Sequence, residues 1–169
     1  ADYKIKIPVK VEIPLDKSVS FMAVGEYHGC AVMTDNSLWC WGLNDHGEIG
    51  LGNVSSSNNE IIRKPMEIDM QFYNPIISID LGPESTCTLH DDGLLNCWGE
   101  NEYGEVGNGL IGGDTSSPVP IQLDSGVTAT GITSGDHFKC ATASDGSIQC
   151  WGYNGNSELG DGTQEPSAY

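Results

Sequence analysis

Six cysteines form the most regular chemical pattern in this sequence of 169 residues. They fall into pairs whose members stand ten residues apart, and each second cysteine is followed by Trp-Gly; the pairs are Cys30 and Cys40, Cys87 and Cys97, and Cys140 and Cys150. Paired cysteines form disulfides or hold zinc, but zinc sites favour cysteines only a few residues apart with further ligands close by. The spacing therefore favours disulfide bonds.

The pairing can be derived from the hairpin that each cysteine pair would build. If Cys30 faces Cys40 on antiparallel strands, the loop ends at Asn36, and the same register puts Gly93 and Gly146 at that position of the other loops. Three-residue hairpin loops commonly end with a left-handed residue, which glycine and asparagine tolerate best. Opposed Cβ atoms lie near disulfide range. We predict the bonds 30–40, 87–97 and 140–150, which indicate an oxidising compartment and a secreted, extracellular protein.

Catalytic chemistry has no comparable pattern in the sequence. There is no Gly-x-Ser-x-Gly elbow, P-loop or His-Glu-x-x-His motif, so we predict that the protein is not an enzyme. The histidines lack a second His or Cys at metal spacing, which predicts structural or surface roles and no metal site; they are His28, His46, His90 and His137. Glu48, Glu105 and Glu158 recur at equivalent positions, where we expect solvated turn carboxylates. Calcium is conceivable in such turns, but EF-hand spacing is absent and no cofactor is predicted.

Charge and hydropathy exclude two classes of partner. Seven Lys and Arg against 24 Asp and Glu give a formal charge of −17, which would repel nucleic-acid phosphates. No run of 18 apolar residues occurs, so we expect no membrane insertion. The sequence starts at Ala1 without a signal-peptide core, which we interpret as a mature secreted chain or an excised fragment. Asn53 opens an Asn-Val-Ser sequon in a polar loop and is the candidate glycosylation site.

The cysteine hairpins belong to a repeat of about 50 residues. Each unit adds a proline-led segment of alternating apolar and polar residues and a second short strand; the expected proline-led strands are 8–13, 65–70 and 118–123, and the second strands are 19–24, 76–81 and 127–133. Four short strands at this period match a β-propeller blade. We predict an all-β array with four antiparallel strands per blade, in repeats at 8–64, 65–117 and 118–165 and the start of a fourth at 166–169.

A tryptophan follows the second cysteine of every pair. Trp41, Trp98 and Trp151 are expected to pack between neighbouring blades, because a blade needs large residues against its neighbour. Trp39 lies outside the repeat pattern and is the better candidate for an exposed contact.

The repeat resembles the regulator of chromosome condensation family, whose unit runs Gly-x-x-His-x-x-Ala-Leu, Asp-Gly, then Trp-Gly-x-Asn-x-x-Gly-Gln-Leu-Gly. Gly25, His28 and Ala31 match the opening, Asp92-Gly93 the turn, and residues 41–50 the close. The resemblance implies a propeller, most often seven-bladed, that serves as a protein-binding platform. The cysteine pairs and the acidity differ from the nuclear branch and are similar to a secreted, cysteine-bearing branch. The resemblance implies no single activity.

Three blades are too few for an ordinary closed propeller, so the array is incomplete or is completed by another chain. Pro166 is expected at the place of Pro65 and Pro118, which leaves the last blade without the strand that residues 8–13 provide at the start. We predict that the N-terminal strand of one copy adds to the last blade of the next and builds a filament; its residues are Ile5, Ile7, Val9, Val11 and Ile13. The alternative is a portion of a longer propeller that binds or inhibits another protein.

Overall fold

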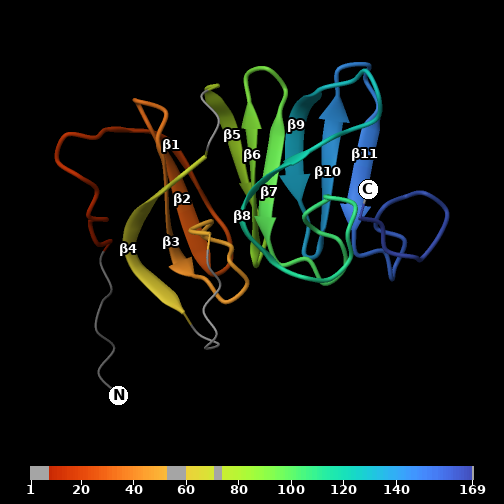
Figure 1. Cartoon of the computed structure of the whole chain (residues 1–169), viewed down its shortest axis with the longest axis horizontal. Helices are drawn as coiled ribbons and strands as arrows, with labels where there is room; N and C mark the ends of the chain where they lie inside the picture. Colours follow the sequence, from red (N-terminus) through yellow and green to blue (C-terminus); the bar gives the residue numbers. More distant parts are fainter. Residues whose placement is uncertain (1–7, 53–59, 71–73, 169) are drawn as a thin grey trace.

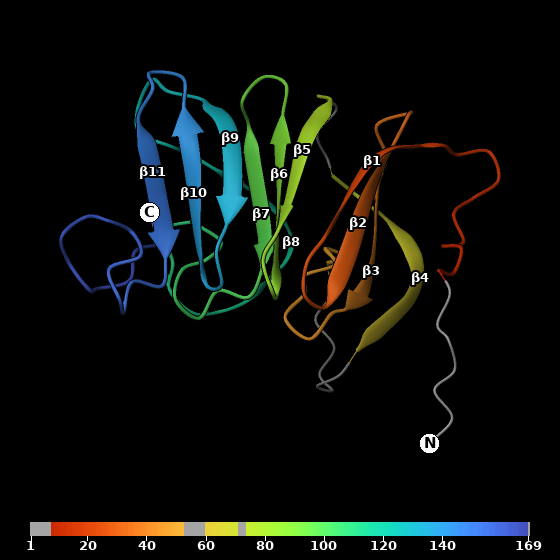
Figure 2. The ribbon, with the colours of Figure 1, turned by 180° about the vertical axis from the view of Figure 1, so that it is seen from behind.

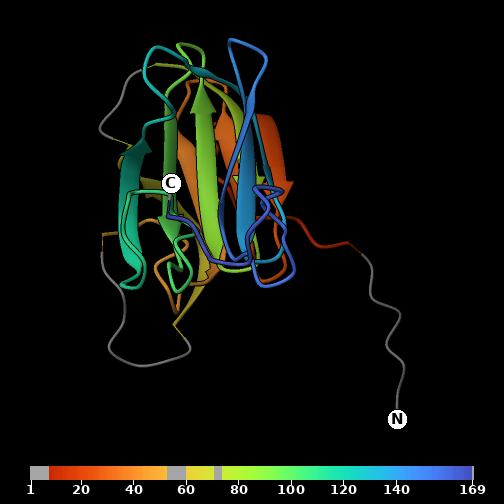
Figure 3. The same ribbon diagram turned by 90° about the vertical axis from the view of Figure 1, so that its right-hand side faces the viewer.

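The computed structural model describes residues 8–52, 60–70 and 74–168, and these residues form three antiparallel sheets that we call blades 1 to 3. The blades stand in a row in chain order, with residues 8–18 beside blade 1 and the C-terminal stretch beside blade 3 (Figure 1). The reverse view shows the same row (Figure 2). A view along the row shows the sheets one behind another, face to face (Figure 3).

Blades 1 and 2 each contain four strands, and blade 3 contains three among the described residues. Blade 1 consists of β1 (Val19–Val24), β2 (His28–Met33), β3 (Leu38–Leu43) and β4 (Ile61–Ile68). Blade 2 consists of β5 (Ile76–Leu81), β6 (Ser85–His90), β7 (Leu95–Gly99) and β8 (Thr115–Ile121), and blade 3 of β9 (Ala129–Ser134), β10 (Phe138–Ala143) and β11 (Ile148–Gly152). Neighbours in sequence are hydrogen-bonded neighbours in each sheet. The predicted class, all-β propeller-type blades in an open array, is confirmed. No helix in the described ranges is long and apolar enough to cross a membrane.

The central hairpin of every blade has the register predicted from the cysteines. Cysteine faces cysteine in each, and the three disulfides join Cys30 to Cys40, Cys87 to Cys97 and Cys140 to Cys150. The last residue of each hairpin loop has a positive φ of 70° at Asn36, 83° at Gly93 and 88° at Gly146. Side-chain alternation and turn conformation therefore specify one register together.

The hydrophobic core lies between the blades. One cluster joins blades 1 and 2, and its members include Val32, Leu38, Ile49, Ile68, Ile79 and Trp98. A second cluster joins blades 2 and 3, and its members include Leu89, Leu95, Val106, Ile121, Ala141 and Trp151. The first two disulfides are fully buried in these clusters, whereas the third lies in blade 3, whose outer side has no neighbouring blade. Each blade therefore depends on its neighbours for burial.

Three expectations about the proline-led segments are corrected by the structure. The segments around Pro65 and Pro118 are the fourth strands of blades 1 and 2, so they pair with the hairpin before them and not with the one after. Residues 8–13 form no strand, because no neighbour pairs with them. Ser167 forms a β-bridge with Gly152, just as Ile62 pairs with Gly42 and Thr115 pairs with Gly99. Pro166 therefore precedes the bridging residue, whereas the other two prolines follow it.

Candidate functional site at the open ends of the array

A tryptophan hydrogen bond recurs at both blade interfaces. The Trp98 Nε1–H of blade 2 donates to the carbonyl oxygen of Glu48 in blade 1 at 2.9 Å, and Trp151 donates to the carbonyl oxygen of Glu105 at 2.9 Å. Both indoles are buried, as predicted for packing between blades. Gly107 has a positive φ of 76°, and an added Cβ would lie 2.6 Å from Trp151 Nε1, so the indole needs a glycine here. The interface thus consists of an indole on one blade and a glycine-rich loop on the blade before it.

A buried asparagine holds each of these loops in shape. The Asn44 side-chain oxygen accepts a hydrogen bond from the N–H of Ile49 at 3.1 Å, and Asn101 accepts one from Val106 at 3.0 Å. Asn154 accepts the equivalent bond from Leu159 at 3.0 Å. The third loop therefore keeps the geometry of the first two.

The repeated glutamates also belong to the loops. A carboxylate oxygen of Glu48 accepts the N–H of His46 at 2.9 Å, and Glu105 and Glu158 make the equivalent bonds at 2.8 Å. The expectation of solvated turn carboxylates is wrong for Glu48 and Glu105, which are buried under the next blade. Glu158 is only half-buried, and its carboxylate accepts hydrogen bonds from Asn156, which lower its pKa.

The two ends of the array each retain half of this interface. At blade 3, an added Cβ at Gly160 would meet nothing within 4 Å, whereas Gly50 and Gly107 meet an indole. At blade 1, Trp41 is only half-buried, and within the described ranges no blade comes before it to offer a loop carbonyl. We call the exposed side of blade 1 around Trp41 the head surface, and β11 with the loop through Leu159 and Gly160 the tail surface.

The tail surface also has an unpaired strand edge. β4 and β8 pair with β3 and β7 along their length, whereas among the described residues only the bridge between Gly152 and Ser167 forms on the outer side of β11. Ile148 is 67% exposed, whereas its counterparts Leu38 and Leu95 are 0% and 1% exposed. A hollow of about 440 Å³ follows this edge, lined by Leu123, Ile148, Cys150, Trp151, Leu159 and Ser167. It lies where a fourth strand would pack.

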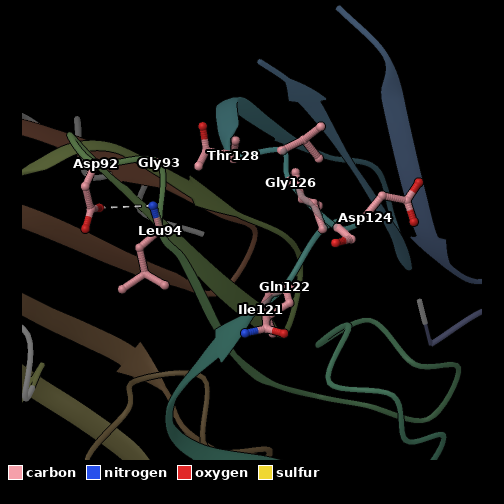
Figure 4. Close-up of a pocket in the computed structure, with 12 residues that line it drawn as sticks. Asp92, Gly93, Leu94, Ile121, Gln122, Asp124, Gly126 and Thr128 are labelled. Carbon is pink, nitrogen blue, oxygen red and sulfur yellow. Dashed lines mark hydrogen bonds between the residues drawn. The ribbon is translucent and has the colours of Figure 1, made fainter. Parts of the chain in front are cut away.

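A second hollow, of about 460 Å³, lies between the hairpin turn of blade 2 and the chain that leads to β9 (Figure 4). The Leu94 N–H donates to the Asp92 carboxylate at 3.1 Å within the turn itself. The Gly93 carbonyl accepts the N–H of Ala129 at 3.1 Å, which ties the turn to blade 3. No histidine, cysteine or lysine lines this hollow. The hydrogen bonds of Asp92 and Gly93 therefore hold the turn and join it to blade 3.

The predicted self-assembly residues are only partly described by the structure. Val9 and Val11 are exposed and line a hollow with Trp41 and Pro65 at the head surface, at the opposite end of the row from β11. Ile13 is half-buried. Ile5, Ile7 and the sequon residue Asn53 lie outside the described residues. Trp39 is half-buried, and its indole donates to Ser37 Oγ at 3.0 Å within its own hairpin.

The four histidines occupy three kinds of position. His28 lies buried between blades 1 and 2, with Nε2 at 2.7 Å from Thr86 Oγ1, and burial near the positive charge of Lys139 lowers its pKa to about 4. His90 Nδ1 hydrogen-bonds the backbone oxygen of Asn74 at 2.8 Å. His46 and His137 come from different blades and meet the same group of carboxylates. No local spacing of these residues in the sequence indicates this meeting.

The stacked blades and their shared indole contacts define the class of the chain, which has β-propeller blades. A family profile described as the regulator of chromosome condensation (RCC1) repeat matches residues 35–89 and 92–142, and a second with the same description matches 19–48 and 76–105. These matches cover more than half of the sequence. The chain therefore belongs to the RCC1 repeat family.

Known relatives agree with this assignment and are much longer. The ultraviolet-B receptor UVR8 of Arabidopsis thaliana is 26% identical over 152 residues, which are 89% of this chain and 33% of the receptor. Human E3 ubiquitin-protein ligase HERC2 is 29% identical, over 90% of this chain and 3% of the ligase. The crystal structure of yeast RCC1 (Prp20) bound to Kap60 matches with a TM-score of 0.77 at 26% identity, over 89% of this chain and 36% of that one. The chain spans about a third or less of these proteins.

Proposed function

We propose that this chain acts in protein–protein interaction and that it joins copies of itself head to tail outside the cell. The observation that carries the proposal is the pair of half-interfaces. The tail loop has the Asn154 hydrogen bond and the bare Gly160 that an indole needs, and the head surface presents Trp41. Docking Trp41 of one copy on the Glu158 carbonyl of another would repeat the contact that joins blades 1 and 2. Heterologous contacts of this kind form rings or filaments.

The N-terminal segment supplies the second half of the proposed contact. Met66 and Val119, each just after a strand proline, pair with the second cysteine of their blades, and Ile68 and Ile121 pair with the leucines two residues earlier. Aligning Pro8 with those prolines sets Val9 opposite Cys150 and Val11 opposite Ile148. Such an added strand would cover the exposed edge of β11.

The present position of this segment permits the exchange. Near the head surface, residues 9–12 are exposed apart from their contacts in one hollow, and Glu12 pairs with Lys64 at 2.7 Å on the surface. Exposed ion pairs contribute little to stability, so little opposes release. Residues 1–17 contain four lysines and three acidic residues, whereas the rest of the chain carries about −18, which favours association between unlike ends.

Secretion and glycosylation are part of the proposal. Three disulfides in 169 residues favour an oxidising compartment. Asn53, which comes between β3 and β4 in the sequence, would then be the acceptor in a glycosylating host. We also propose sequence repeats at 8–64, 65–117 and 118–165, with a fourth beginning at 166. The first strand of the second and third repeats completes the preceding blade.

A longer propeller that binds or inhibits another protein is the second candidate. It is favoured by the length of the relatives and by the bridge at Ser167, which begins a fourth strand in blade 3. In that case, chain beyond residue 169 would complete the blade, and the 169-residue chain by itself would stay monomeric.

Three variants separate the two candidates by sedimentation and electron microscopy. Deletion of residues 1–13 together with Trp41→Ala removes the head, and Ile148→Lys blocks the tail. Leu110→Lys is the matched control, because Leu110 is 63% exposed in the loop between β7 and β8. We expect the wild type and the control to form chains of subunits, each blocked variant to stay monomeric, and a mixture of the two blocked variants to stop at dimers. A wild type that is monomeric at every concentration would overturn self-assembly.

A further inference from the structure

Five ionisable side chains from all three blades converge along one side of the row. His46 follows β3 of blade 1, Glu84 precedes β6 and Glu100 follows β7 of blade 2, Glu105 lies in the next loop, and His137 precedes β10 of blade 3. These strand ends lie together at the lower side of the row in Figure 1. Two groups of three potential ligands share Glu100, and within each group the ligand atoms lie within 4.8 Å of one another.

The group formed by Glu100, Glu105 and His137 contains a buried oxygen with no hydrogen-bond donor. Glu105 is 2% exposed, and its Oε2 accepts the N–H of Tyr103 at 2.8 Å. Its Oε1 accepts no hydrogen bond and lies 3.4 Å from His137 Nδ1, which is also 3.1 Å from Glu100 Oε2. Buried polar atoms in native proteins nearly always have a partner. A cation beside Oε1 would supply one.

The second group is oriented by a carboxylate behind its imidazole. His46 Nδ1 lies 2.8 Å from Asp114 Oδ2, and His46 Nε2 faces Glu84 Oε2 at 3.6 Å. Metal-binding histidines usually bond a carboxylate or carbonyl through the other ring nitrogen, which fixes the ring and raises its basicity. His46 has this arrangement, with Nε2 directed toward Glu84.

The electrostatics of the cluster also favour a cation. Burial raises the pKa of Glu100, and the nearby charges of Glu105 and Glu84 raise it further. Three carboxylates in partial burial repel one another unless positive charge is added. Two imidazoles that are neutral when they bind metal supply lone pairs for it.

We propose that a divalent cation of the zinc class binds beside Glu100, with Glu105 and His137 as its other ligands. His46 and Glu84 lie on the other side of Glu100 and form a second ligand set. Mixed imidazole and carboxylate ligands suit zinc, whereas calcium takes oxygen ligands alone. The ion would link blade 2 to blade 3, and the second set would reach blade 1. This binding is a property of a single chain and does not depend on assembly.

Isothermal titration with Zn²⁺ tests the site on untagged protein with intact disulfides, because a histidine tag or free thiols would bind zinc themselves. We expect His137→Ala and Glu105→Gln each to weaken binding by at least about tenfold. Glu158→Gln is the matched control, because Glu158 occupies the equivalent loop position in blade 3 without the cluster, and its affinity should equal that of the wild type. Circular dichroism establishes that each variant is folded.

Three results would overturn the zinc site. The first is an absence of zinc binding by the folded wild type. The second is equal affinity in the Glu105→Gln, His137→Ala and Glu158→Gln variants, which would place the ion elsewhere. The third is displacement of Zn²⁺ by an equal concentration of Ca²⁺, which would indicate oxygen ligands only. Visible spectra of the Co²⁺-loaded protein, read for nitrogen and oxygen ligands without thiolate bands, give an independent readout.

Discussion

Truncating two equivalent side chains compares the apolar burial in blade 3 with that in blade 2. Leu95 of β7 and Ile148 of β11 hold the same place in their hairpins, since they pair with Leu89 and Thr142. Leu95 is 1% exposed and pairs with Ile121 of β8 in the same sheet, whereas Ile148 is 67% exposed. The same Ala substitution therefore creates a cavity in one blade and removes mostly hydrated atoms in the other.

The two losses of stability should differ by about 2 kcal/mol. Leu95→Ala removes three buried carbon groups at about 0.8 kcal/mol each and leaves a cavity, so we expect a loss of about 3 kcal/mol. Ile148→Ala removes side-chain atoms of which only about a third are buried, and it leaves no cavity. We therefore expect a loss of about 1 kcal/mol. Urea unfolding of the dilute, disulfide-intact chain, followed by tryptophan fluorescence, measures both. Equal losses would mean that the edge of β11 is already covered in the single chain and would refute the argument.

Two further predictions concern the blade interfaces. Burial lowers the pKa of His28 to about 4 from its usual 6.5, so below pH 6.5 the unfolded chain binds a proton that the folded chain excludes. The free energy of unfolding should fall by up to about 3 kcal/mol between pH 6.5 and 4, and His28→Gln, measured by urea titration at each pH, should lack this component. Gly107→Ala should lower the melting temperature more than Gly160→Ala, because both have positive φ but only Gly107 lies against an indole. Equal melting temperatures would contradict the indole contact.

The hairpins could be predicted from sequence because their determinants are local. Alternation and turn length limit the register to one choice, and a one-residue slip would move Cys30 and Cys40 to different faces. The strands predicted at 19–24 and 76–81 have those bounds in the structure. The strand predicted at 127–133 forms at Ala129–Ser134, a shift of the usual size for element ends.

The partners of the outer strands could not be predicted from alternation. An apolar and polar alternation indicates a half-buried strand but does not say which neighbour it joins. Pro65 and Pro118 lie in strands that close the blade before them, and residues 8–13 have the same pattern without a strand. Pairing of these segments depends on which edge the chain reaches after a long connection, and that is a tertiary property.

The proposed metal ligands were missed for a related reason. Their positions are separated by stretches that place no two ligands of one group at metal spacing, and only the stacking of blades brings them together. One signal was present in the repeat. Glu84 and His137 each stand two residues after the glycine that precedes the hairpin, so stacked blades present them at the same level. An alignment of the repeats by their polar residues, as well as by the shared motif, groups Glu84 with His137.

The arrangement of interfaces explains why the ends of this chain matter for its stability. In repeat proteins, stability is approximately the sum of the terms for single units and for nearest-neighbour contacts. Three blades form two such contacts, each with its own hydrophobic cluster and indole hydrogen bond. Head-to-tail joining, as proposed, would add a third contact of the same kind for every chain. It would also place Trp41, Ile148 and Leu159, which water now reaches, in the environment that their counterparts already occupy. Blade 3, which has one neighbouring blade and three strands in the described part of the chain, should therefore gain the most from a partner.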